Sequence, residues 1–127
     1  MLNFIKLICV ICSLAGSILF AEPQVKNLKD DENTADAKIV TQKEKNFSVL
    51  EIEAVVGEPI IFLNLDTVVH NVFSATGSHV FNLGMGAPNS KKSVVFDKPG
   101  EVDVFCAIHP KMKLKIKVKD SKKTDPK

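Results

Sequence analysis

Three side chains with metal-binding atoms follow one another closely near the end of the chain: Cys106, His109 and Met112. They lie three residues apart in the run Phe-Cys-Ala-Ile-His-Pro-Lys-Met, with alternating apolar residues on both sides. Two strands joined by a short loop would hold a thiolate, an imidazole and a thioether at one end of a domain. Soft sulfur donors with imidazole suit copper. The spacing therefore predicts a metal site that takes Cys106 and His109, and Met112 at longer range.

A second histidine is available for this site, in the run Asn-Leu-Asp-Thr-Val-Val-His that ends at His70. Two histidines and one cysteine in a trigonal arrangement, with a weak axial methionine, form the blue-copper site. His70 followed by Asn71, together with Cys106-x-x-His109-x-x-Met112, resembles the type 1 blue-copper family, the cupredoxins. Within that family the short ligand loop is most similar to that of the amicyanin/plastocyanin-like proteins.

The resemblance covers residues 37–119 and implies an all-β, Greek-key β-sandwich with one type 1 copper site. It implies His70, Cys106 and His109 as equatorial ligands and Met112 as the axial ligand. It also implies that Asn71 braces the two ligand-bearing loops, which is the kind of support that orients metal ligands. The chain departs from amicyanin in one respect, because Ala107 stands where a hydroxyl is expected. Only backbone groups are then left to meet Asn71 on that side.

The hydrophobic pattern by itself predicts strands. Apolar residues alternate with lysines between residues 111 and 119, and Val102 and Val104 alternate with acidic residues before Cys106. Residues 60–65 form a nearly continuous apolar run, as expected for a strand buried on both sides. No segment in the domain has helical period and length. Short strands at this spacing predict an all-β sandwich of about seven or eight strands.

The composition shifts at both ends predict four segments. Residues 1–21 combine one early lysine with an apolar run, which is typical of a secretory signal peptide, although an uncleaved anchor has the same pattern. Residues 22–36 are polar and acidic, which favours a flexible leader. Residues 37–119 form the copper domain, and residues 120–127 a disordered lysine-rich tail.

Removal of the signal peptide would leave Cys106 as the only one of three cysteines, so the mature chain would contain no internal disulfide. The formal net charge is +2 and every basic residue is a lysine. This charge balance does not point to nucleic acid or to an anionic membrane. We also expect no membrane span once the signal is cleaved.

Each candidate residue also has a structural interpretation. A lone cysteine after an apolar strand is commonly a buried small hydrophobe. Met112 is in phase with the apolar residues that follow it, so it is also a candidate for the core. His79 is expected at the surface, with a weak second copper site as the alternative. Met85, between two glycines, is an alternate thioether or part of an apolar patch around the site.

These observations predict a periplasmic copper protein that carries single electrons and is not an enzyme. The resemblance implies redox protein partners, such as a dehydrogenase or a c-type cytochrome, and we expect a monomer. Two alternatives use the same residues differently. One is a periplasmic copper chaperone or storage module, and the other is a secreted β-sandwich that binds proteins without metal.

Overall fold

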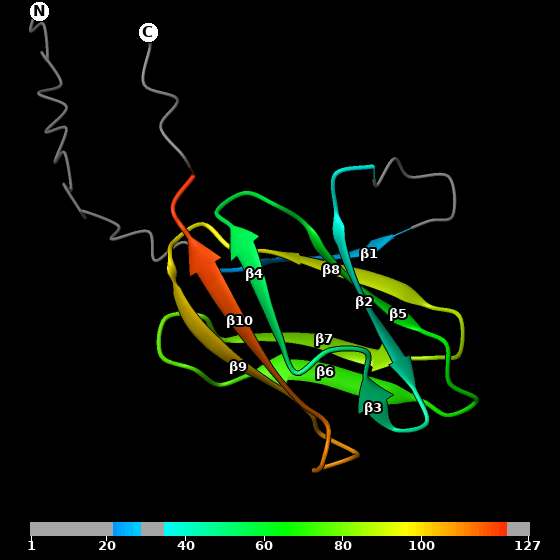
Figure 1. Cartoon of the computed structure of the whole chain (residues 1–127). Coiled ribbons are helices and arrows are strands. Elements are labelled where there is room, and N and C mark those ends of the chain that lie inside the picture. The colour runs from blue at the N-terminus through cyan, green and yellow to red at the C-terminus, as the bar shows by residue number, and fades with distance from the viewer. Residues whose placement is uncertain (1–21, 29–34, 122–127) are drawn as a thin grey trace, which may run out of the picture.

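The computed structural model describes residues 22–28 and 35–121, and the segment expected to be a signal peptide lies outside them (Figure 1). The described residues form strands and loops, and they include no helix long and apolar enough to cross a membrane. The strands are β1 (Gln24–Leu28), β2 (Lys38–Lys43), β3 (Asn46–Phe47), β4 (Glu51–Val55), β5 (Ile60–Asn64), β6 (His70–Ser74), β7 (Phe81–Gly86), β8 (Lys91–Val95), β9 (Gly100–Cys106) and β10 (Lys113–Lys119).

The strands form two five-stranded sheets, which confirms the predicted all-β sandwich. One sheet has the order β1-β8-β5-β2-β3 and the other the order β4-β10-β9-β6-β7. The β2–β5 and β4–β10 pairs are parallel, and the remaining pairs are antiparallel. In Figure 1, β4, β10 and β9 lie on one side of the molecule, and β8, β5 and β2 on the other.

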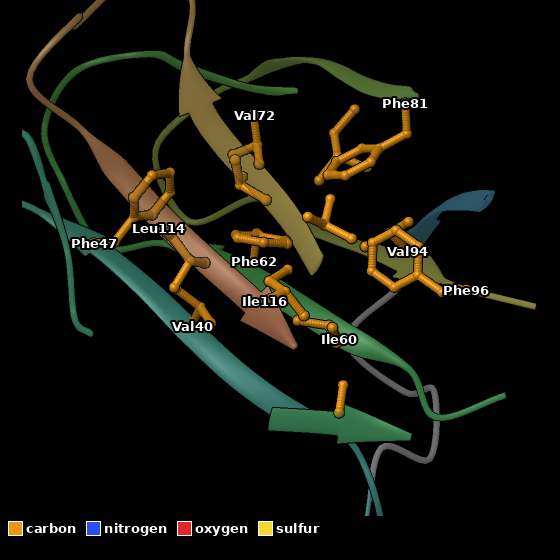
Figure 2. Close-up of a cluster of buried hydrophobic side chains, with 14 of the residues drawn as sticks. Val40, Phe47, Ile60, Phe62, Val72, Phe81, Val94, Phe96, Leu114 and Ile116 are labelled. Atoms are coloured by element: carbon orange, nitrogen blue, oxygen red, sulfur yellow. The ribbon is translucent and has the colours of Figure 1, made fainter. Parts of the chain in front are cut away.

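The core fills the space between the two sheets (Figure 2). Alternate residues of a strand point to opposite faces, so every second side chain of β9 and β10 faces inward. Val102 and Val104 on β9 are fully buried, as is Ile116 on β10. From the opposite sheet, Phe62 on β5 points into the same space. The predicted alternation of β9 and β10 is therefore observed.

The outward residues of β10 are lysines that pair with acids on its two neighbours. Lys117 contacts Glu51 on β4 at 2.8 Å, and Lys115 contacts Glu101 on β9 at 3.2 Å. Exposed pairs of this kind contribute little to stability. The lysines of β10 and their acidic partners therefore form a solvated face of this sheet.

The structure differs from the sequence prediction at the N-terminal side. Within the predicted flexible leader, Gln24–Leu28 forms β1 and pairs with β8 over five residues. An edge strand needs backbone hydrogen bonds more than large buried side chains, and Val25 indeed remains 43% exposed. Together with the two-residue strand β3, β1 raises the number of strands in residues 22–28 and 35–121 to ten, against the expected seven or eight.

The fold brings the separate sequence motifs to one end of the sandwich. β6 and β9 are neighbours, with Val72 directly opposite Cys106. His70 lies two residues before Val72 and therefore on the same face of β6, which makes it a diagonal neighbour of Cys106. The loop between β9 and β10, orange at the lower edge of Figure 1, carries His109 next to this pair.

Candidate metal centre

His70, Cys106 and His109 converge at this end of the sandwich. The Sγ atom of Cys106 lies 3.8 Å from Nδ1 of His70 and 3.6 Å from Nδ1 of His109. The two Nδ1 atoms are 3.1 Å apart. The side chains of His70 and Cys106 are buried, whereas His109 is half-buried. Three of the four predicted ligand residues thus present their donor atoms to one point.

Asp66 holds the ring of His70 from the other side. Its Oδ2 atom lies 3.0 Å from Nε2 of His70. A carboxylate accepts a hydrogen bond, so Nε2 carries the proton and Nδ1 keeps its lone pair facing Cys106. Histidines that bind metals are oriented in this manner by a carboxylate on the second nitrogen. Sequence analysis did not identify this role of Asp66.

Asp66 is itself fixed by backbone groups. The N–H of Lys45 donates to Oδ2 at 2.9 Å, and the N–H of Thr67 donates to Oδ1 at 2.8 Å. The hydrogen bonds from Lys45 and then from His70 lower the pKa of Asp66. Lys45 lies in the two-residue turn between β2 and β3, where it and Glu44 both have positive φ. This turn is adopted at some conformational cost and positions one of the N–H donors.

Cys106 is the last residue of β9, and its side chain is buried, with the residue 2% exposed. The backbone N–H of Asn71 points to Sγ, with an N–S distance of 3.5 Å. This contact holds the sulfur in a fixed position beside the two histidines. Among the described residues Cys106 is a free cysteine.

The loop that follows Cys106 is closed by its own backbone. The N–H of Met112 donates to the carbonyl of His109 at 2.9 Å, and the N–H of Cys106 donates to the carbonyl of Met112 at 3.3 Å. Met112 itself is buried and belongs to the hydrophobic core. The interpretation of Met112 as a core residue is therefore confirmed. Met112 also ends the ligand loop, and its ligation of a metal stays a prediction.

His109 connects the buried donors to the surface. Burial lowers its pKa, and the nearby charges of His70 and Lys45 lower it further, against a smaller opposite effect of Asp66. A neutral imidazole is the form that binds metal. The neighbouring Ile108 is 44% exposed, so the ring sits beside apolar surface.

The donor set fits a single transition-metal ion. Bonds of such an ion to imidazole nitrogen and thiolate sulfur are roughly 2.0–2.1 and 2.3 Å long. At trigonal angles, two bound nitrogens then lie about 3.5 Å apart, and nitrogen and sulfur about 3.8 Å apart. The three distances between donor atoms, 3.1, 3.6 and 3.8 Å, are close to these values. Two imidazoles and a thiolate are the equatorial ligand set typical of blue-copper sites.

Asn71 supports the site mainly through its backbone. Its carbonyl accepts a hydrogen bond from the N–H of Ala107 at 3.1 Å, which joins β6 to the ligand loop. Its side-chain amide instead donates to Oδ1 of Asn82 on β7 at 2.9 Å. Asn71 therefore ties the loop of Cys106 to β6 through its backbone, and ties β6 to β7 through its side chain.

Asn64 is a second support that sequence analysis missed. Its Nδ2 atom donates to the carbonyls of Val68 and Gly86 at 2.9 and 3.0 Å, and its Oδ1 accepts from the N–H of Asp66 at 2.9 Å. The side chain is buried. It shapes the loop that leads to His70. The only hint in the sequence is that Asn64 is a polar residue at the end of an apolar run. Its hydrogen-bond partners can be identified only from the fold.

The sequence left two interpretations open for each of His79 and Met85. The expectation that His79 lies at the surface is wrong, because this side chain is buried against Phe96 at a ring distance of 5.6 Å. Its Nε2 atom donates to the carbonyl of Lys98 at 3.0 Å, which gives the ring a structural role. Met85 is 60% exposed on β7, as expected for part of an apolar surface near the site.

No protein-family model matches the sequence, and no curated protein matches it. The fold does match solved structures. Amicyanin from Paracoccus versutus (Thiobacillus versutus) superposes with a TM-score of 0.69 and 25% sequence identity, over 76% of this chain and 97% of that chain. A reduced Cu(I) form of an amicyanin mutant at pH 4 gives 0.67 and 23%, over 76% and 98%. An oxidised amicyanin mutant gives 0.68 and 21% over the same shares.

These matches cover about three quarters of the chain and agree with the chemistry of the donor cluster. The chain has the cupredoxin β-sandwich fold seen in amicyanin, and its His70-Cys106-His109 cluster is consistent with a cupredoxin.

Proposed function

We propose that this protein is a periplasmic type 1 blue-copper protein that carries single electrons between redox partners. The observation that carries the proposal is the convergence of two imidazole nitrogens and one buried thiol sulfur at one end of a cupredoxin sandwich. In this proposal His70, Cys106 and His109 are the equatorial ligands and Met112 is the axial ligand. Asn71 joins the two segments that carry them.

Copper in this site would supply a one-electron couple between Cu(II) and Cu(I). The residues of the chain supply a frame of hydrogen bonds that is formed without the metal. Asp66 fixes the ring of His70, and the N–H of Asn71 fixes the sulfur of Cys106. The loop after Cys106 is closed by backbone hydrogen bonds. A preorganised frame lowers the structural rearrangement that accompanies electron transfer, which suits a carrier.

The exposed edge of the site is the proposed route for electrons. His70 and Cys106 are buried, whereas His109 is half-buried and adjoins the exposed Ile108. A redox partner can approach the ring of His109 through apolar contact while water stays away from the thiolate. A dehydrogenase and a c-type cytochrome are partners of this class. The proposed secretion to the periplasm rests on the signal-like residues 1–21.

The alternative of a copper chaperone or storage module has less support. Such a module would present clustered histidine and methionine side chains to a receiving protein. Here His79 is buried in structural contacts, and Met85 is a single exposed thioether on β7. Burial of Cys106 also argues for retention of the metal. The carrier is therefore the function that the geometry favours.

Electron self-exchange in mixtures of oxidised and reduced copper protein tests the proposal. A carrier should show a reversible one-electron couple and rapid exchange. The variant Ile108→Lys should slow the exchange without changing the absorption spectrum, because it places a charge beside His109. The control Ile39→Lys alters a comparably exposed residue, 56% against 44%, on β2. Slow exchange in the unmutated protein, together with ready loss of Cu(I) to a chelator, would contradict the carrier and favour the storage module.

A further inference from the structure

Lys92 reaches from one sheet to the other beside the candidate metal centre. It lies on β8, and its Nζ atom donates to the carbonyls of Leu83 and Met85 on β7, each at 2.7 Å. These two residues lie on either side of Gly84, and both carbonyls are within hydrogen-bonding distance of Nζ. One ammonium group can therefore bind both. Hydrogen bonds from a charged donor are stronger than those between neutral groups.

The segment that Lys92 holds is the one that pairs with the ligand strand. Met85 lies opposite Asn71, and Gly86 lies opposite His70. Gly84, between the two bound carbonyls, has φ of +71°. Glycine restricts the backbone less than any other residue, so a segment with two glycines needs contacts from outside to fix it. Lys92 supplies two such contacts.

The aliphatic part of the Lys92 side chain lies near the backbone of His70. Lys92 and His70 line the same small cavity, together with Phe62 and Val72. A Cβ atom placed on Gly86 would be 4.0 Å from Cε of Lys92 and 3.6 Å from the carbonyl oxygen of His70, so the two residues flank one point. The residues that line this cavity include no acid. The cation is therefore not neutralised within the cavity itself.

We propose that Lys92 is a positioning residue of the metal centre, which fixes β7 behind His70 and raises the reduction potential of the bound metal. This inference rests on the proposed copper site. A fixed positive charge near the metal disfavours Cu(II) more than Cu(I), because Cu(II) carries one more positive charge. The two backbone hydrogen bonds keep the ammonium in place, and this makes its electrostatic effect a property of the fold.

Three variants separate charge from hydrogen bonding. Lys92→Met removes both, Lys92→Gln keeps an N–H donor without charge, and Lys92→Arg keeps both. Lys113→Met is the matched control, because it removes one exposed lysine from β10. In voltammetry on the copper-loaded proteins, Lys92→Met and Lys92→Gln should lower the equilibrium constant for electron uptake by roughly tenfold, which is about 59 mV for one electron. Lys92→Arg should restore it, and Lys113→Met should leave it nearly unchanged.

Hydrogen exchange on the metal-free proteins tests the positioning role independently of copper. Lys92→Met should speed the exchange of backbone amides in β7 and at the start of β6, and Lys92→Arg should not. If Lys92→Met does not fold, Lys92→Gln carries both measurements. The inference would be overturned if Lys92→Met and Lys92→Gln had the same reduction potential as Lys113→Met and their backbone amides exchanged as in the unmutated protein. Failure of the unmutated protein to form a blue site would instead reject the proposed function, and the exchange experiment would still decide the role in positioning.

Discussion

Replacement of Asn64 by alanine should destabilise the metal end of the sandwich. The side chain makes three hydrogen bonds, to the carbonyls of Val68 and Gly86 and from the N–H of Asp66. Asn64→Ala removes all three and leaves its backbone hydrogen bonds to the loop before β8 intact. The change therefore isolates what this buried amide does for the loop that leads to His70.

The three contacts set the expected magnitude. A hydrogen bond contributes about 1 kcal/mol net, and a buried polar group left without a partner costs about 1–3 kcal/mol. We expect Asn64→Ala to lower the free energy of unfolding by about 3 kcal/mol. That is a large share of the roughly 5–15 kcal/mol that stabilises a small domain. The loop should also become less ordered, which should weaken metal binding.

Urea unfolding of the metal-free protein measures this loss directly. The matched control is Asn46→Ala, because the side chain of Asn46 is exposed and donates to the nearby carbonyl of Glu44. The control should change the free energy of unfolding by less than about 0.5 kcal/mol. Equal effects of the two substitutions would refute the argument that Asn64 organises the loop.

Three further predictions concern the donor cluster. Met112→Gln should keep copper bound and lower the reduction potential in voltammetry, because an oxygen donor favours Cu(II); an unchanged potential would place the axial ligand elsewhere. Asp66→Ala should weaken metal binding by about 10–100-fold in competition titrations, because His70 loses the carboxylate that orients it; unchanged affinity would contradict this role. In the metal-free protein, NMR should find the pKa of His109 below its ordinary value, because burial disfavours the charged ring. Between the pKa of His109 in the folded protein and its higher pKa in the unfolded chain, the unfolded chain binds more protons. The free energy of unfolding should therefore fall as the pH falls through that window, and a pH-independent free energy of unfolding would contradict the lowered pKa.

The sandwich and the closeness of Cys106 to His109 could be predicted because both depend on local pattern, whereas the convergence of His70 with them was implied by the resemblance to the cupredoxins. Alternation with period two sets which side chains of β9 face inward, and it places Cys106 in phase with Val102 and Val104. The three-residue spacing then keeps His109 within the same loop. The assignment of these residues as metal ligands stays a prediction that copper binding must test.

Other features depend on contacts between distant segments, which local pattern does not encode. The lysine alternation of residues 111–119 predicted a strand, but it did not show that β10 lies between β4 and β9, where acidic neighbours face its lysines. His79 looked like a surface residue, but the turn before β9 covers it. The supports of His70 are of the same kind, because Asp66 is useful only once the turn at Lys45 is folded against it.

Absorption spectroscopy during a Cu(II) titration tests whether this protein forms a type 1 copper site. The metal-free protein and its Cys106→Ser variant are each titrated, because the intense blue band of a type 1 site arises from the copper–thiolate bond. If the chain forms a type 1 site, the band should grow to saturation at one copper per chain in the unmutated protein and should be absent in the variant, which should stay folded. An unmutated protein that binds no copper, or a blue band that survives in Cys106→Ser, would contradict it.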